Sequence, residues 1–75
     1  MTSENTPGAR IRQARLAAGL KQAELAARAG ISAPYLNLIE HDRRKIAGKL
    51  LIDLAKLLNV EATLLSQGAE AALIA

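Results

Sequence analysis

The 75-residue sequence predicts an all-α fold, and three observations support this prediction. Ala and Leu dominate a composition that is 51% hydrophobic, and both residues lose little side-chain freedom in a helix. No useful length of chain alternates between apolar and polar residues, as a half-buried strand would. Residues that favour helix starts and helix ends recur along the chain. The length allows one domain with a small core.

The first helix is expected from Pro7 to about Ala18. Thr6 can cap its N-terminus, and Pro7 at the first helical position gives up an N–H that has no partner there. Gly19 is expected to end the helix in the left-handed conformation. The preceding residues 1–6 are polar, so we expect them to form a disordered arm.

Two short helices are expected next, over residues 21–29 and 33–40. Gly30 tolerates the positive φ that a sharp bend between them needs, and Ser32 can cap the second helix. Ala26 is the small residue required where two steeply crossing helices touch. The spacing of these features predicts a helix-turn-helix, with apolar residues directed into a shared core: Leu25, Ile31, Leu36 and Ile39.

A fourth helix is predicted over residues 48–58, and a short fifth helix from residue 61 or 62. Asn59 is expected as a left-handed stop between them. The domain is therefore expected to span residues 7–66, followed by a tail over 67–75 that is helical or begins a linker. The fourth helix carries a wide apolar stripe, formed by Leu50, Leu51, Leu54, Ala55 and Leu58.

Composition narrows the possible functions. The chain lacks cysteine, has a single histidine, His41, and contains no glycine-rich phosphate loop, so we expect neither an enzyme nor a bound cofactor or metal. No apolar run approaches the roughly 20 residues of a membrane span, and the first residues lack a secretory signal. These observations favour a cytoplasmic protein.

Positive charge is modest overall but clustered. Ten Lys and Arg against seven Asp and Glu leave a net charge of +3, which by itself is weak evidence for a polyanionic partner. A charge run alone is usually a solvated face. Four basic residues and one acid, Asp42, follow His41, and the basic residues are Arg43, Arg44, Lys45 and Lys49.

The segment QAELAARAGISAPYLNLI, together with IRQAR, YLNLIE and LAKLLNV, resembles the Cro/C1-type helix-turn-helix family of phage and bacterial repressors, also called the xenobiotic-response-element family. The resemblance covers residues 8–65. It implies a five-helix, lambda-repressor-like, DNA-binding regulatory domain whose third helix enters the major groove. GISAPYLNLIEHDRR is similar to regulators of short-chain fatty acid metabolism. Those carry a C-terminal acyl-CoA-sensing region, which is absent from this sequence.

The resemblance implies a set of base-reading residues on the third helix. Asn37 can pair bidentately with adenine, and Tyr35 can reach a phosphate or a base edge. Ala33 and Leu38 offer only apolar contacts, for example to a thymine methyl group, so DNA shape is expected to supply part of the specificity. The expected reading face consists of Ser32, Ala33, Pro34, Tyr35, Asn37 and Leu38.

Other residues are expected to contact phosphates or to hold the fold. Gln22 begins the second helix and is expected at the DNA backbone, with an ordinary first-turn role as the alternative. Arg15 and Glu40 match a structural ion pair of the family, which we assign to the fold. The expected phosphate contacts are His41, Arg43, Arg44, Lys45 and Lys49, with Arg44 the strongest candidate.

A single domain offers one short helix to a groove, so we expect a homodimer on a pseudo-palindromic operator, with half-sites ~34 Å apart. The alternative is a helix-turn-helix scaffold that acts as a protein–protein interaction module. Its support is the apolar tail and the few polar groups on the third helix. Salt dependence separates the two, because release of counterions makes DNA binding steeply sensitive to salt.

Overall fold

The computed structural model describes residues 6–46 and 48–65. It contains four α-helices, α1 (Pro7–Ala17), α2 (Gln22–Ala29), α3 (Ala33–Glu40) and α4 (Gly48–Leu58). A helical turn at residues 62–65 follows, and none of the described residues forms a strand. The all-α prediction is confirmed. The predictions for residues 1–5 and for the tail at 67–75 fall outside the described residues.

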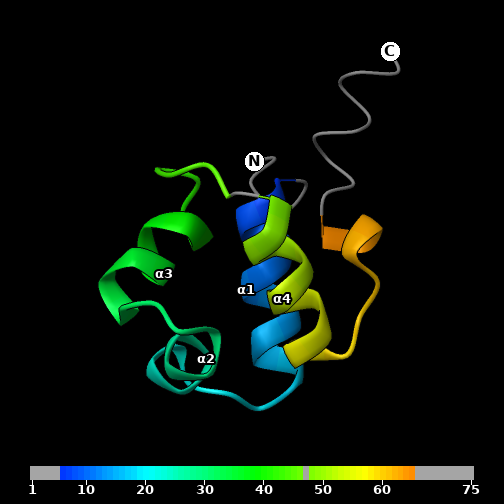
Figure 1. Cartoon of the computed structure of the whole chain (residues 1–75), viewed down its shortest axis with the longest axis horizontal. Helices are drawn as coiled ribbons and strands as arrows, with labels where there is room; N and C mark the ends of the chain where they lie inside the picture. Colours follow the sequence, from blue (N-terminus) through cyan, green and yellow to red (C-terminus); the bar gives the residue numbers. More distant parts are fainter. Residues whose placement is uncertain (1–5, 47, 66–75) are drawn as a thin grey trace.

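The helices pack as two adjoining pairs. In Figure 1, α1 and α4 lie at the centre, α2 and α3 lie on one side of them, and the turn at residues 62–65 lies on the other. The packed pairs of helices are α1 with α3, α1 with α4, α2 with α3 and α2 with α4. This arrangement holds α2 and α3 against a shared support, which fixes the direction in which α3 faces solvent.

The N-termini of the helices form as the local sequence predicts. The Thr6 hydroxyl accepts a hydrogen bond from the backbone N–H of Ala9 (3.2 Å), and the Ser32 hydroxyl accepts one from Tyr35 (3.1 Å). α2 begins one residue later than expected, because Lys21 is extended at φ −78° and ψ 156°. The backbone N–H of Lys21 donates to the Glu24 carboxylate at 2.8 Å. This bond satisfies a donor that has no partner within the helix.

Each of the four helices is followed by a residue with positive φ. The backbone N–H of the next residue then donates a hydrogen bond to the carbonyl five residues before it. The predicted stops at Gly19, Gly30 and Asn59 are confirmed, with φ of 74°, 75° and 58°. The fourth stop, Asp42 at φ 60° after α3, was not predicted. The four closing hydrogen bonds run from Leu20 to Arg15, Ile31 to Ala26, Arg43 to Leu38 and Val60 to Ala55.

The core is aliphatic and draws on every helix. α3 contributes Leu36 and Ile39, which are 0% and 1% exposed, as the spacing predicted. Burial of such side chains is the main stabilising contribution in a chain without disulfides. With one face of α3 buried in this way, its opposite face is left to solvent. The core consists of Ile11, Leu25, Ala26, Leu36, Ile39, Leu54, Ala55, Leu58 and Leu65.

Candidate nucleic-acid interface

The solvent face of α3 is narrower than the sequence predicted. Asn37 is exposed, as are Ser32 and Pro34 at the start of the helix. Ala33 and Tyr35 are only partly exposed, because they pack against the core. Leu38, the sixth predicted reading residue, is also partly buried. Of the six side chains, Asn37 is the exposed one that carries an amide, which can both donate and accept hydrogen bonds.

A buried ion pair lies beneath this face. The Arg15 guanidinium of α1 donates from Nε to Glu40 Oε2 at 2.7 Å and from Nη2 to Oε1 at 3.0 Å. The side chains are 9% and 0% exposed. Arg15 Nη1 also donates to the carbonyl of Leu20 at 3.0 Å. This bidentate pair ties α1 to the end of α3, and it confirms the predicted pairing of these two residues.

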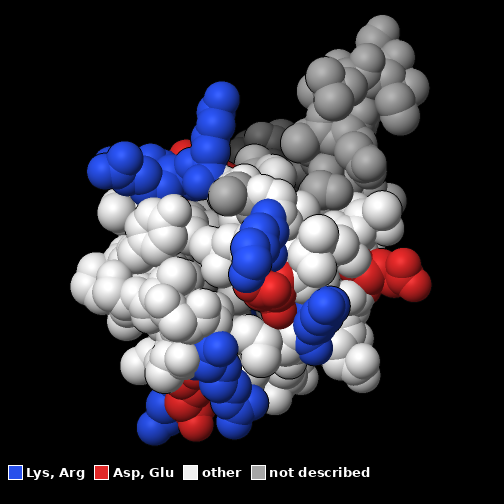
Figure 2. Space-filling model, in the orientation of Figure 1, with Lys and Arg blue, Asp and Glu red and all other residues white. Residues whose placement is uncertain are grey.

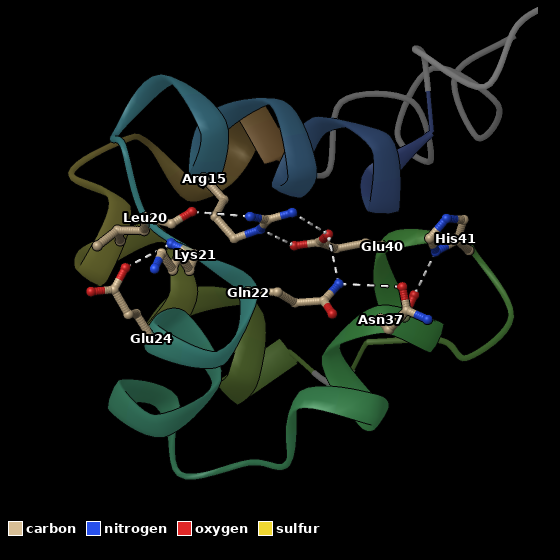
Figure 3. Close-up of polar contacts among 8 residues, drawn as sticks. All are labelled: Arg15, Leu20, Lys21, Gln22, Glu24, Asn37, Glu40 and His41. Atoms are coloured by element: carbon tan, nitrogen blue, oxygen red, sulfur yellow. Dashed lines mark hydrogen bonds and ion pairs between the residues drawn. The ribbon is translucent and has the colours of Figure 1, made fainter.

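Gln22 connects the buried pair to the exposed face. Its Nε2 donates to Glu40 Oε1 at 3.2 Å and to Asn37 Oδ1 at 3.3 Å. Figure 3 shows the resulting row of side chains, from Arg15 through Glu40 and Gln22 to Asn37. Sequence reasoning considered Gln22 only as a phosphate contact or a first-turn residue. Nothing in the local pattern pointed to Asn37, because the two residues lie on different helices.

His41 folds back onto the last turn of α3. Its ring Nδ1 lies 2.8 Å from the backbone oxygen of Asn37 (Figure 3). A carbonyl oxygen can only accept, so Nδ1 carries the hydrogen and donates it. The neutral ring then leaves Nε2 as an acceptor, which suits a phosphate oxygen poorly.

Three cations follow α3 in the loop after Asp42. Arg43, Arg44 and Lys45, hereafter the cationic loop, are all exposed. Figure 2 shows basic side chains gathered over the loop that follows α3, beside a surface of α3 that carries no charge in this view. The structure thus brings the predicted phosphate contacts next to the predicted reading helix. An uncharged surface bordered by cations suits a groove flanked by phosphates.

Asp42 attaches the cationic loop to the start of α1. Its carboxylate accepts a hydrogen bond from the backbone N–H of Gly8 at 3.0 Å and one from the Thr6 hydroxyl at 2.5 Å. An anion at the N-terminus of a helix also stabilises the helix dipole. Sequence reasoning treated Asp42 only as an acid within a basic run. The available signal was its place directly after α3, where the other helices carry a left-handed stop.

Lys49 has a partner within the chain. Its Nζ lies 3.4 Å from Asp53 Oδ2, one turn further along α4, and the side chains are 90% and 40% exposed. The sequence suggested an external phosphate because a cation opposes the dipole at a helix start. Asp53 supplies a neighbouring anion that offsets this charge, and the phosphate contact of Lys49 stays a prediction. Such an exposed pair contributes little to stability.

The described segments contain no helix long and apolar enough to cross a bilayer. Within the same segments, no three His, Asp or Glu side chains gather in a way that could hold a metal ion.

Comparison with known proteins identifies relatives among regulators. The HTH-type transcriptional regulator RamB of Mycobacterium tuberculosis is 37% identical over 73 residues, or 97% of this chain. The propionyl-CoA carboxylase regulator of Cereibacter sphaeroides is 37% identical over 59 residues, or 79% of the chain. This chain spans only 15% and 13% of the length of these two relatives. The similarity therefore concerns one small part of each longer protein.

A solved structure and a family model agree with these relatives. The P22 c2 repressor, solved in complex with a synthetic operator, has a TM-score of 0.78 and 28% identity, covering 84% of this chain and 96% of that one. The two chains therefore share the helical fold that the sequence predicts. The helix-turn-helix family model matches residues 11–65. The chain belongs to the helix-turn-helix family, of the Cro/C1 type.

Proposed function

We propose that this chain binds double-stranded DNA as part of a transcriptional regulator, with α3 in the major groove and the cationic loop on the phosphates. One observation carries this proposal: three exposed cations, Arg43, Arg44 and Lys45, follow α3 in the chain, and basic side chains gather over this loop beside an uncharged surface of α3 (Figure 2). Phosphate contacts set the register of a protein on DNA, and groove contacts read the bases. The chain offers both kinds of group side by side.

The P22 c2 repressor supports the proposal, because that similar protein was solved in complex with an operator. In this mode Asn37 is the principal base contact and Arg44 the principal phosphate contact. Ser32, Pro34 and the exposed parts of Ala33, Tyr35 and Leu38 complete the surface in the groove. Gln22, His41 and Lys49 are secondary candidates, since each has a partner within the chain.

We further propose a homodimer on a pseudo-palindromic site. A helix of eight residues, such as α3, contacts only a few base pairs, so tight specific binding needs two copies. Their recognition helices would enter successive major grooves, ~34 Å apart.

The wider role follows from the longer relatives. The propionyl-CoA carboxylase regulator is similar to this chain over 59 residues. Its name supports the proposal that this chain belongs to a regulator of short-chain acyl metabolism. We propose that the chain is the DNA-binding part of such a regulator, acting in the cytoplasm. Sensing of an acyl-CoA would then belong to another region of that regulator, since the resemblance places it in a C-terminal part.

Salt dependence tests DNA binding directly. The affinity of the chain for duplex DNA is measured by fluorescence anisotropy between about 50 and 200 mM salt. If each of the three cations of the cationic loop and Lys49 neutralises one phosphate, the log–log slope should lie between about −3 and −4 per domain. A partner held by an apolar interface would show almost no slope. A flat response would therefore favour a protein-interaction module and contradict the proposal.

The chain offers a matched pair of variants for this test. One variant replaces the three residues of the cationic loop by Ala, and the other replaces three exposed cations elsewhere, Lys21, Arg28 and Lys56. Both lose the same net charge. The first should lose most of the salt slope and the second should keep it. Equal loss in both would indicate that overall charge, and not the loop beside α3, attracts DNA.

A further inference from the structure

We propose that Gln22 determines base specificity by positioning Asn37, so that Asn37 reads a guanine in the major groove and not an adenine. The inference rests on the proposed function, in which α3 lies in the major groove of duplex DNA. It deepens that function by naming the base edge that the exposed amide recognises and the residue that sets its orientation.

The buried ion pair fixes the orientation of the Gln22 amide. Glu40 is buried, with 0% of its side chain exposed, and its Oε1 lies 3.2 Å from Gln22 Nε2. The carboxylate paired with Arg15 can only accept hydrogen bonds. The nitrogen of Gln22, and not its oxygen, must therefore face Glu40, because the opposite orientation would place two acceptors in contact.

The Gln22 nitrogen in turn orients Asn37. A primary amide nitrogen carries two hydrogens, and the second one points to Asn37 Oδ1 at 3.3 Å. With its oxygen facing Gln22, Asn37 turns its nitrogen away from Gln22 (Figure 3). Asn37 is exposed on α3. The group that it presents outward is therefore the Nδ2 amino group, which has two donors and no acceptor.

This orientation favours one base. Bidentate pairing with adenine requires an acceptor for the adenine N6 hydrogen beside a donor for N7, but the acceptor of Asn37 faces the protein. Guanine presents two acceptors in the major groove, O6 and N7, which match two donors. Thymine presents a single acceptor, and cytosine presents a donor. Guanine is thus the base that the oriented amide fits best.

The Asn37 contact can be located without knowing the operator in advance. Sites are selected by the wild-type chain from a random duplex library, and each base pair of the selected site is then replaced in turn. Fluorescence anisotropy gives the affinity of wild type and of Asn37→Ala for every replacement. The Asn37 contact is the position at which wild type distinguishes among the base pairs and Asn37→Ala does not. Guanine should be preferred over adenine there by roughly tenfold or more.

Variants of Gln22 separate positioning from simple contact. Gln22→Met has a similar length but no donor, and it should reduce the guanine preference at that position by about tenfold while other positions keep theirs. Gln22→Lys retains donors for Glu40 Oε1 and Asn37 Oδ1, and it should preserve the guanine preference. Circular dichroism at the assay temperature verifies that each variant is folded.

Asn37→Asp provides an independent test at an exposed position, where the fold is not at risk. The aspartate still accepts from Gln22, but it presents an acceptor outward, so the preference should move to cytosine, whose N4 amino group donates. Adenine at the Asn37 position in wild type would overturn the inference. So would a Gln22→Met variant that loses affinity equally for all four bases. In both cases DNA binding itself would stand, whereas failure of wild type to bind duplex DNA would overturn the proposed function.

Discussion

The backbone N–H of Gly8 donates a hydrogen bond to the carboxylate of Asp42, which follows it by 34 residues in the chain and lies 3.0 Å away. The first residue belongs to the opening turn of α1, and the second is the left-handed stop of α3. This contact fixes the point from which the cationic loop departs. The orientation of the proposed phosphate contacts thus depends on the start of α1.

Gly8→Ala tests the close approach behind this contact. A Cβ atom at Gly8 would lie 2.2 Å from the backbone oxygen of Ile39, and a backbone oxygen cannot move without shifting α3. We expect a loss of about 2 kcal/mol in the free energy of unfolding, measured with urea. Gly48→Ala is the control, because no atom lies within 4 Å of its added Cβ. Equal stability of the two variants would show that α1 does not abut α3 as described.

Variants of Asp42 separate its backbone conformation from its carboxylate. Asp42→Gly accepts φ 60° without strain but loses both hydrogen bonds, and we expect a loss of about 1 kcal/mol. Asp42→Ala loses the same bonds and must also adopt left-handed φ, so its loss should be about 1 kcal/mol larger. Asp42→Asn tolerates this φ and keeps one acceptor, so it should be the most stable of the three. Urea unfolding gives the order, and Ala as stable as Gly would contradict the assignment.

The Arg15–Glu40 pair should be far more sensitive than the exposed pair on α4. Glu40→Gln leaves Arg15 buried without a counter-charge, and we expect a loss of about 3–5 kcal/mol. The free energy of unfolding of a 75-residue chain is only about 4–11 kcal/mol in total, so much of this variant would unfold at moderate temperature. Asp53→Asn, in the exposed pair with Lys49, should change stability by less than about 0.5 kcal/mol. Comparable effects at the two sites would refute the structural role given to Glu40.

Arg44→Ala should weaken binding to all duplex sequences alike, because a phosphate contact carries no base information. The salt slope should become shallower by about one unit. Arg44→Lys keeps the charge and should retain the slope, even though it loses the planar fork of the guanidinium. Anisotropy titrations on a selected site and on an unrelated duplex provide both quantities. A selective loss on the specific site alone would identify Arg44 as a base contact.

The sequence by itself determined the four helices and three of their four left-handed stops. The caps at Thr6 and Ser32 and the stops at Gly19, Gly30 and Asn59 act through backbone atoms only a few residues away. Local spacing therefore contains the information that places them. The apolar positions that form the core follow from helical periodicity for the same reason. The Arg15–Glu40 pair, by contrast, was expected only from family resemblance, since 25 residues separate its members.

Tertiary structure alone decided how the proposed interface is assembled. Asp42 meets Gly8, and Gln22 meets both Glu40 and Asn37, across separations of 15 residues or more. The packing of α3 also half-buries Ala33, Tyr35 and Leu38, which the sequence had placed on the open face. Hydrogen bonds and burial of this kind depend on which helices cross and at what distance. No short-range pattern specifies that geometry, because it results from the packing of the whole core.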